Sequence, residues 1–139
     1  MPVRAFDHVA IPSERPEALL RFYGQLGFGV PDPEAWRRSG VPFFSIQLRE
    51  QKINVHAPAL WQQAGFTLRG PAALPGCGDF CFVWEGGGTA LRQTLEAAGA
   101  EIVEGPVERI GGRDGGRAKG TSLYTRDPDG NLLEFIVYE

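Results

Sequence analysis

The sequence predicts an α+β fold made of two similar halves, each with a strand, a helix and then two or three further strands. Three observations predict it. Segments near residues 16–26 and 89–98 place apolar residues at helical spacing, whereas the other apolar segments alternate with a period of two. A stretch rich in proline and glycine, 58–77, separates the halves. We therefore expect a single domain, with one module over about 3–57, a linker over about 58–77 and a second module over about 78–139.

The first half opens with a predicted strand over residues 3–11. In this segment alternation places Phe6, His8 and Ala10 on one face and Asp7, Val9 and Ile11 on the other. Ser13 is the expected N-cap of the helix that follows, and Gly27 is expected to end it. Its apolar stripe consists of Leu19, Leu20, Phe22, Tyr23 and Leu26.

After this helix, residues 29–40 contain two prolines and are expected to form a loop with room for a short helical turn. Two strands, 43–48 and 52–57, then flank the charged turn Arg49-Glu50-Gln51.

The second half repeats the order. A strand is predicted over residues 79–84, and Thr89 is the expected N-cap of a helix that ends at Gly99. A short strand over 101–104 and a glycine-rich loop over 105–120 are expected next.

The chain closes with a predicted β-hairpin. The turn Asp127-Pro128-Asp129-Gly130 joins an incoming strand over 121–125 to an outgoing strand over 132–138. Alternation in the outgoing strand places Leu133, Phe135 and Val137 on one face and Leu132, Glu134 and Ile136 on the other. Because a carboxylate is costly to bury unpaired, Glu134 must either face water or have a partner.

Composition and charge exclude several classes of function. A net charge of −3 argues against nucleic-acid binding, which needs a concentrated basic face. No segment approaches the length that crosses a membrane and no apolar signal core is present, so the chain is most simply cytoplasmic. Cys77 and Cys81 stand alone as one C-x3-C pair, which predicts reduced thiols.

The two halves can be aligned as an internal repeat. In that alignment His8 corresponds to Asp79, and His56 corresponds to Glu134. All four lie on the strand faces opposite the large apolar residues, so a pseudo-twofold axis would gather two imidazoles and two carboxylates on one surface. This set suits a divalent first-row metal with open positions for water or substrate, Asp79 reaching it least directly. The alternative is that each is an ordinary solvated or hydrogen-bonded strand residue.

Several segments together resemble the vicinal oxygen chelate superfamily, which includes glyoxalase I, extradiol dioxygenases and bleomycin-binding proteins. They are Asp7-His8-Val9-Ala10-Ile11, the helix segment 21–28, and the stretch from Asp127 to Glu134. The stretches 51–56, 79–82 and 104–109 are similar to those of glyoxalase-domain-containing proteins of the lactoylglutathione-lyase-like or virulence-associated kind. The resemblance implies two βαβββ modules in tandem that form a cup-shaped mixed sheet around a metal, usually in a homodimer.

The resemblance also implies a function. It suggests a glyoxalase I-like lyase or isomerase that depends on a divalent ion (Ni, Co, Zn, Mn or Fe) and acts on a small oxygenated substrate, such as a glutathione hemithioacetal, through a metal-stabilised enediolate. Glu134 would be the base, and His8, His56 and Asp79 would help to hold the ion. Compared with bacterial glyoxalase I, one imidazole and one carboxylate have exchanged places. The alternatives are a non-catalytic module that sequesters a small molecule, as in bleomycin resistance, and a dioxygenase.

Substrate contacts are expected from a basic loop and from aromatic residues. The segment from Arg109 to Lys119, which includes Arg113, carries four cations that could close over an anionic tail such as a glutathione carboxylate; the alternative is a solvated loop. Cys81 shares the strand face of Asp79 and either lines the cup or is a small buried residue. Trp61 lies in a loop and could form a pocket wall.

Overall fold

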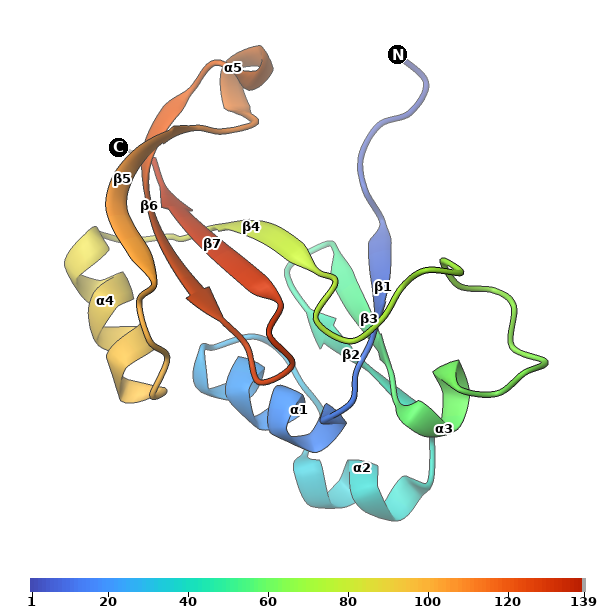
Figure 1. Cartoon of the computed structure of the whole chain (residues 1–139). Coiled ribbons are helices and arrows are strands. Elements are labelled where there is room, and N and C mark those ends of the chain that lie inside the picture. Colours follow the sequence, from blue (N-terminus) through green and yellow to red (C-terminus); the bar gives the residue numbers. More distant parts are fainter. Residues whose placement is uncertain (139) are drawn as a thin grey trace. The chain divides into compact units, whose positions relative to one another are not determined.

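The computed structural model describes residues 1–138 and divides the chain into two compact units, residues 1–77 and the segment from Gly78 onward (Figure 1). Each unit contains one sheet and its own helices, so the α+β class and the order of strand, helix and further strands are confirmed. No helix within residues 1–138 is long and apolar enough to cross a lipid bilayer.

The first unit has a three-stranded sheet in the order β1-β3-β2. Strand β1 runs parallel to β3, and β2 runs antiparallel to it. A single bridge between Gly29 and Gln47 stands where a further strand would complete the module. The elements are β1 (His8–Pro12), α1 (Pro16–Gln25), α2 (Pro33–Ser39), β2 (Phe43–Gln47), β3 (Lys52–His56) and α3 (Pro58–Trp61).

Helix α1 has the apolar stripe that the sequence predicts, and Leu19, Leu20 and Tyr23 are fully buried. Its N-cap, however, is Arg15 rather than Ser13. The Ser13 hydroxyl accepts a hydrogen bond from the Arg15 amide at 3.1 Å, ahead of the helix. The start shifts because Pro16 occupies the first helical turn, where a proline needs no amide donor.

The segment predicted as a loop, residues 29–40, contains the two-turn helix α2. Its N-cap is Asp32, whose carboxylate accepts a hydrogen bond from the Ala35 amide at 2.9 Å. Pro33 follows the cap, so a proline that suggested a loop instead begins a helix.

The second unit is a complete βαβββ module. Its four-stranded sheet has the order β4-β7-β6-β5, with β4 parallel to β7 and the other pairs antiparallel. The buried face of this sheet carries Leu123, Leu133 and Phe135. The elements are β4 (Asp79–Val83), α4 (Gly88–Ala97), β5 (Glu104–Ile110), the short turn α5 (Arg113–Gly116), β6 (Lys119–Arg126) and β7 (Leu132–Val137).

Two predictions about the second unit were wrong. Thr89 lies inside α4, whose N-cap is Gly87 without a side-chain hydrogen bond. The strand expected over 101–104 begins only at Glu104 and runs to Ile110, through much of the predicted glycine-rich loop. Gly105 marks a shift in the β5–β6 register and has a φ of 100°, so it serves a strand irregularity rather than a loop.

The closing hairpin is confirmed, and a buried polar network fixes its turn. The Asp127 carboxylate accepts hydrogen bonds from the Asp129 and Asn131 amides, both at 3.0 Å, and from the Asn131 side chain at 2.8 Å. The Asn131 side-chain oxygen Oδ1 accepts a hydrogen bond from the Gly78 amide at 2.7 Å. The network thereby joins the turn to the residue before β4.

We predict that Asn131→Ala lowers the free energy of unfolding by about 2–4 kcal/mol. The side chain is fully buried, and its removal takes away the acceptor of the Gly78 amide and one of the donors to the Asp127 carboxylate. Urea denaturation followed by circular dichroism measures this loss. Gln93→Ala, which removes an exposed amide from α4, is the matched control and should change stability by less than about 0.5 kcal/mol. Equal effects for both variants would contradict the network's structural role.

Candidate functional site

Strand registers correct the repeat alignment predicted from the sequence. In the first unit His8 pairs with Lys52, and in the second unit Asp79 pairs with Leu132. With His8 set equivalent to Asp79, the position equivalent to Glu134 is therefore Asn54. His56 is two residues further along β3, so its predicted correspondence with Glu134 is wrong.

The same register separates the two histidines within the first unit. His8 pairs with Lys52 and His56 pairs with Pro12, at the two ends of the β1–β3 pair. Four residues of strand correspond to about 13 Å. His8 and His56 share a sheet face, but this separation argues against their holding one ion together.

Glu134 is surrounded by polar partners on the open face of the second unit's sheet. In register it lies between Cys81 of β4 and Tyr124 of β6. The Ser122 hydroxyl, fully buried, donates a hydrogen bond to its carboxylate at 2.6 Å. Asp79 lies on the same face, diagonally two residues along β4. The condition that Glu134 be solvated or have a partner is met, since it is half-buried and hydrogen-bonded.

Tyr124 connects Glu134 to Arg109. The Arg109 Nε donates to the Tyr124 hydroxyl at 3.0 Å, and the guanidinium carbon lies 5.5 Å from the ring centroid. Burial raises the pKa of Tyr124, and a hydrogen bond to Glu134 raises it further, against the opposing effect of Arg109. The phenol therefore stays neutral at physiological pH and can donate to the carboxylate.

Cys81 is a neutral thiol beside the same carboxylate. Burial, followed by the charge of Glu134 and a hydrogen bond to it, raises the pKa of Cys81 to about 12. The residue is exposed overall and both cysteines are free, as the sequence predicts.

We predict that iodoacetamide at pH 8 modifies Cys77 readily and Cys81 very slowly. With a pKa of about 12, only about one Cys81 thiol in ten thousand is ionised at this pH, and the thiolate is the reactive form. Peptide mass spectrometry of a time course measures both rates. Glu134→Gln removes the neighbouring charge and should accelerate labelling of Cys81. Labelling of both thiols at similar rates would contradict this electrostatic description.

His8 is oriented by its sequence neighbour. Its Nδ1 lies 2.7 Å from a carboxylate oxygen of Asp7, so this nitrogen carries the proton and Nε2 keeps a free lone pair. A carboxylate that hydrogen-bonds the far nitrogen is the usual support of a histidine metal ligand. The imidazole is 47% exposed, which leaves it accessible.

His56 has different surroundings. Its ring meets the Phe66 ring edge-on, with centroids 5.3 Å apart. Burial, and then the charge of Arg69, lower the pKa of His56, so its imidazole is neutral at physiological pH. The positive charge of Arg69 also opposes the binding of a dication at His56.

The basic residues predicted to close over an anion have partners within the second unit. Arg109 contacts Tyr124, and the guanidinium carbon of Arg113 lies 4.4 Å from the centroid of the Tyr138 ring. Arg117 bonds Asp114 at 3.0 Å, and Lys119 lies 3.6 Å from Glu108. Arg109 alone of the four is thereby placed beside Glu134.

The described residues contain no group of three His, Cys, Asp or Glu side chains that could hold one ion. Of the predicted ligands, His8 and Glu134 are each oriented by a hydrogen-bonding neighbour, as metal ligands usually are.

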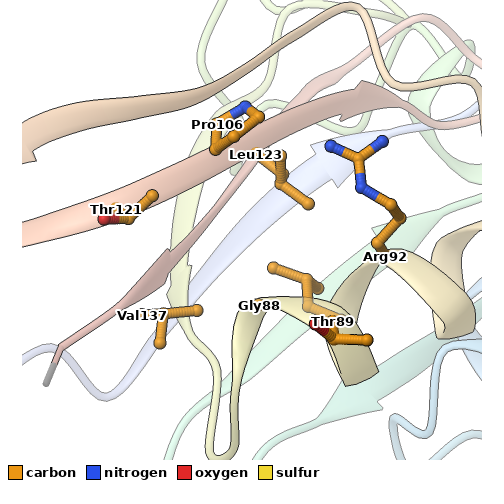
Figure 2. A pocket seen from close by; sticks show the side chains of 8 residues that line it. Gly88, Thr89, Arg92, Pro106, Thr121, Leu123 and Val137 are labelled. Carbon is orange, nitrogen blue, oxygen red and sulfur yellow. The ribbon is translucent and has the colours of Figure 1, made fainter.

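A separate hollow of about 350 Å³ lies on the opposite face of the second unit's sheet (Figure 2). Strand alternation separates its sheet residues from Ser122 and Glu134. One of its lining side chains, Arg92, is charged. The lining residues are Gly88, Thr89, Leu91, Arg92, Pro106, Thr121, Leu123 and Val137.

Ser122 and Tyr124 were not among the site residues predicted from the sequence. Both lie on the incoming strand of the hairpin, at the alternate positions that face Glu134. Counting residues back across the turn would have paired Tyr124 with Glu134, because the hairpin register is set by the turn.

The fold and this open face define a class of small two-module α+β proteins that present polar side chains from their sheets. No family model matches the chain. It is 33% identical over 144 residues to the glyoxalase domain-containing protein RDO1 of Mycosarcoma maydis, covering 100% of this chain and 71% of that protein. It is 32% identical to the virulence protein STM3117 of Salmonella typhimurium, covering 99% of this chain and 87% of that protein.

The chain therefore belongs to the glyoxalase-domain proteins of the vicinal oxygen chelate superfamily. The crystal structure of STM3117 superposes with a TM-score of 0.82 at 30% identity, covering 100% of both chains. Two more distant structures share the fold alone. Lactoylglutathione lyase from Agrobacterium tumefaciens has a TM-score of 0.68 at 20% identity, covering 99% of this chain and 96% of that chain. The antibiotic-binding protein TnmS3 from Streptomyces sp. CB03234 has a TM-score of 0.68 at 16% identity, covering 100% of this chain and 99% of that chain.

Proposed function

We propose that this protein is a glyoxalase-type lyase or isomerase that depends on a divalent metal ion. The observation that carries the proposal is the Glu134 carboxylate, held by the Ser122 hydroxyl at 2.6 Å in the middle of the open sheet face. His8, Asp79 and Glu134 are the proposed metal ligands. A divalent ion bound there would polarise a carbonyl oxygen of the substrate.

In this proposal Glu134 is the catalytic base. It removes a proton from the carbon next to the substrate carbonyl and returns it to the neighbouring carbon. Ser122 and Tyr124 donate hydrogen bonds that hold the carboxylate in one orientation. Cys81 remains protonated near pH 7 and so takes no part as a nucleophile.

The alternative is a binding protein that sequesters a small molecule without chemistry. Aromatic side chains favour it. His56 and Phe66 meet edge-on, Trp61 lies nearby under Arg69, and the antibiotic-binding TnmS3 shares the fold. Rings of this kind bind planar ligands well. A homodimer is proposed for either function, and light scattering of the purified protein tests it.

The test is metal analysis and an activity assay on the untagged protein. A stoichiometric divalent ion, together with turnover of methylglyoxal plus glutathione, would support the enzyme proposal. His8→Ala should lose the ion, whereas His56→Ala should retain it, because the strand register separates the two histidines. A protein without bound metal or turnover that nevertheless binds small aromatic molecules would support the binding module instead.

A further inference from the structure

Arg69 has a hydrogen-bond donor without an acceptor in the first unit. Its guanidinium carbon lies 5.4 Å from the centroid of the Trp61 ring, and a terminal nitrogen donates to the Ala73 carbonyl. Its Nε is buried and has no hydrogen-bond partner among residues 1–138. A buried donor attached to a charged group is expensive to leave unpaired. Arg69 as a whole is only half-buried.

One aromatic ring lies against this cation, and two more lie at the neighbouring His56. The Trp61 ring is fixed by a hydrogen bond of 2.9 Å from its Nε1 to the Ser13 carbonyl. Phe66 meets the ring of His56, and Phe43 lies opposite His56 in the sheet and is 49% exposed. Burial, and then the charge of Arg69, lower the pKa of His56. Arg69 is therefore a cation stacked on Trp61 in the neighbourhood of His56.

The basic residues of the second unit do not offer the same feature. Arg113 is stacked on Tyr138, and Arg117 and Lys119 are each paired with a carboxylate. Arg109 donates its Nε to Tyr124. Arg69 differs from them because its Nε is buried and has no acceptor among residues 1–138.

We propose that Arg69 binds the carboxylate of a planar or aromatic carboxylic acid whose apolar part packs against Trp61 and Phe66. This ligand site goes beyond the proposed function and does not depend on it, because it lies beside His56 rather than at His8 and Glu134. A carboxylate gives a guanidinium charge-assisted hydrogen bonds in matching planar geometry, and the rings supply the apolar contact. A neutral ligand of the same shape would lack the charged contact.

Binding of benzoate, phenylacetate and 1-naphthoate to metal-free protein tests the proposal, with benzamide as the neutral probe. Isothermal titration calorimetry or ligand-observed NMR gives the Kd. We expect saturable binding of at least one acid, at least about tenfold weaker in Arg69→Gln, because a charged hydrogen bond is lost. Arg69→Lys should retain part of the affinity. Arg38→Gln, an exposed arginine on α2, is the control and should bind like the unmodified protein.

Two results would overturn the proposal: no saturable binding of any of the three acids, or the same Kd in Arg69→Gln. If Arg69→Gln does not fold, the Kd of Arg69→Lys is the deciding measurement. This variant loses the planar guanidinium but keeps the positive charge. A threefold or greater weakening supports the proposal, and an unchanged Kd contradicts it. Carboxylate binding is measured on metal-free protein, whereas turnover is measured on metal-loaded protein. Failure of one therefore does not imply failure of the other.

Discussion

Glu134→Gln is expected to reduce turnover of the methylglyoxal–glutathione adduct by a factor of about 10² to 10⁴, the usual contribution of a positioned general base. The amide has the shape of the carboxylate and can still accept the Ser122 hydrogen bond, but it cannot take a proton. It is also a poorer ligand for a divalent ion. Steady-state kinetics on metal-loaded protein measures the loss, with the ion content of each preparation determined in parallel.

The matched control for this substitution is Glu96→Gln, an exposed glutamate on α4. It carries the same change in charge on a helix of the second unit rather than on β7, and it should keep full activity. Thermal unfolding of both variants should resemble that of the unmodified protein, because Glu134 is only half-buried. Full activity of Glu134→Gln would contradict the proposal that Glu134 is the catalytic base.

Gly105→Ala is expected to destabilise the protein by about 2–5 kcal/mol, a large part of a typical domain's total. The φ of Gly105 is 100°, which costs an L-residue about 1–2 kcal/mol. A Cβ at this position would lie 2.3 Å from the Ser122 carbonyl oxygen, and forcing apart a packed backbone costs about 1–3 kcal/mol more. Denaturant unfolding at 25 °C measures the sum.

Gly112→Ala provides the control for that prediction. Its φ of −77° suits any L-residue, and an added Cβ would meet no atom within 4 Å. We expect a change between zero and a stabilisation of about 1 kcal/mol, because alanine restricts the unfolded chain. The two sites differ in backbone φ and in the space around the added Cβ, so equal stabilities would contradict the close approach of β5 and β6. A folded fraction of Gly105→Ala should also show weaker activity, since Ser122 supports Glu134.

Much of the fold follows from periodicity in the sequence. Helical spacing found α1 and α4, and alternation found the face of β7 that carries Glu134. The register of the repeat was wrong by two residues for a definite reason. Side chains on a strand return to the same face every two residues, so a shift of two preserves every inside and outside assignment. Only the hydrogen-bonded pairing shows that Asn54, rather than His56, corresponds to Glu134.

Glycines and prolines led to wrong loop predictions where they belong to helices and strands. Pro33 begins a helix, and Gly105 accommodates a neighbouring strand. The partners of Glu134 and His8 required pairing or contact information. Tyr124 lies ten residues earlier across the hairpin, and Asp7 supports His8 from the preceding position. Arg69 lies between predicted elements, where no periodicity indicates what a side chain contacts.

Anomalous diffraction from crystals of the protein loaded with cobalt or nickel tests the central claim most directly. We predict one strong peak within about 2.0–2.2 Å of both His8 Nε2 and a Glu134 carboxylate oxygen, the usual bond lengths for such ligands. The Asp7 contact to His8 Nδ1 should persist in that structure. A peak at His56 without His8 and Glu134, or no ordered ion near Glu134, would contradict it.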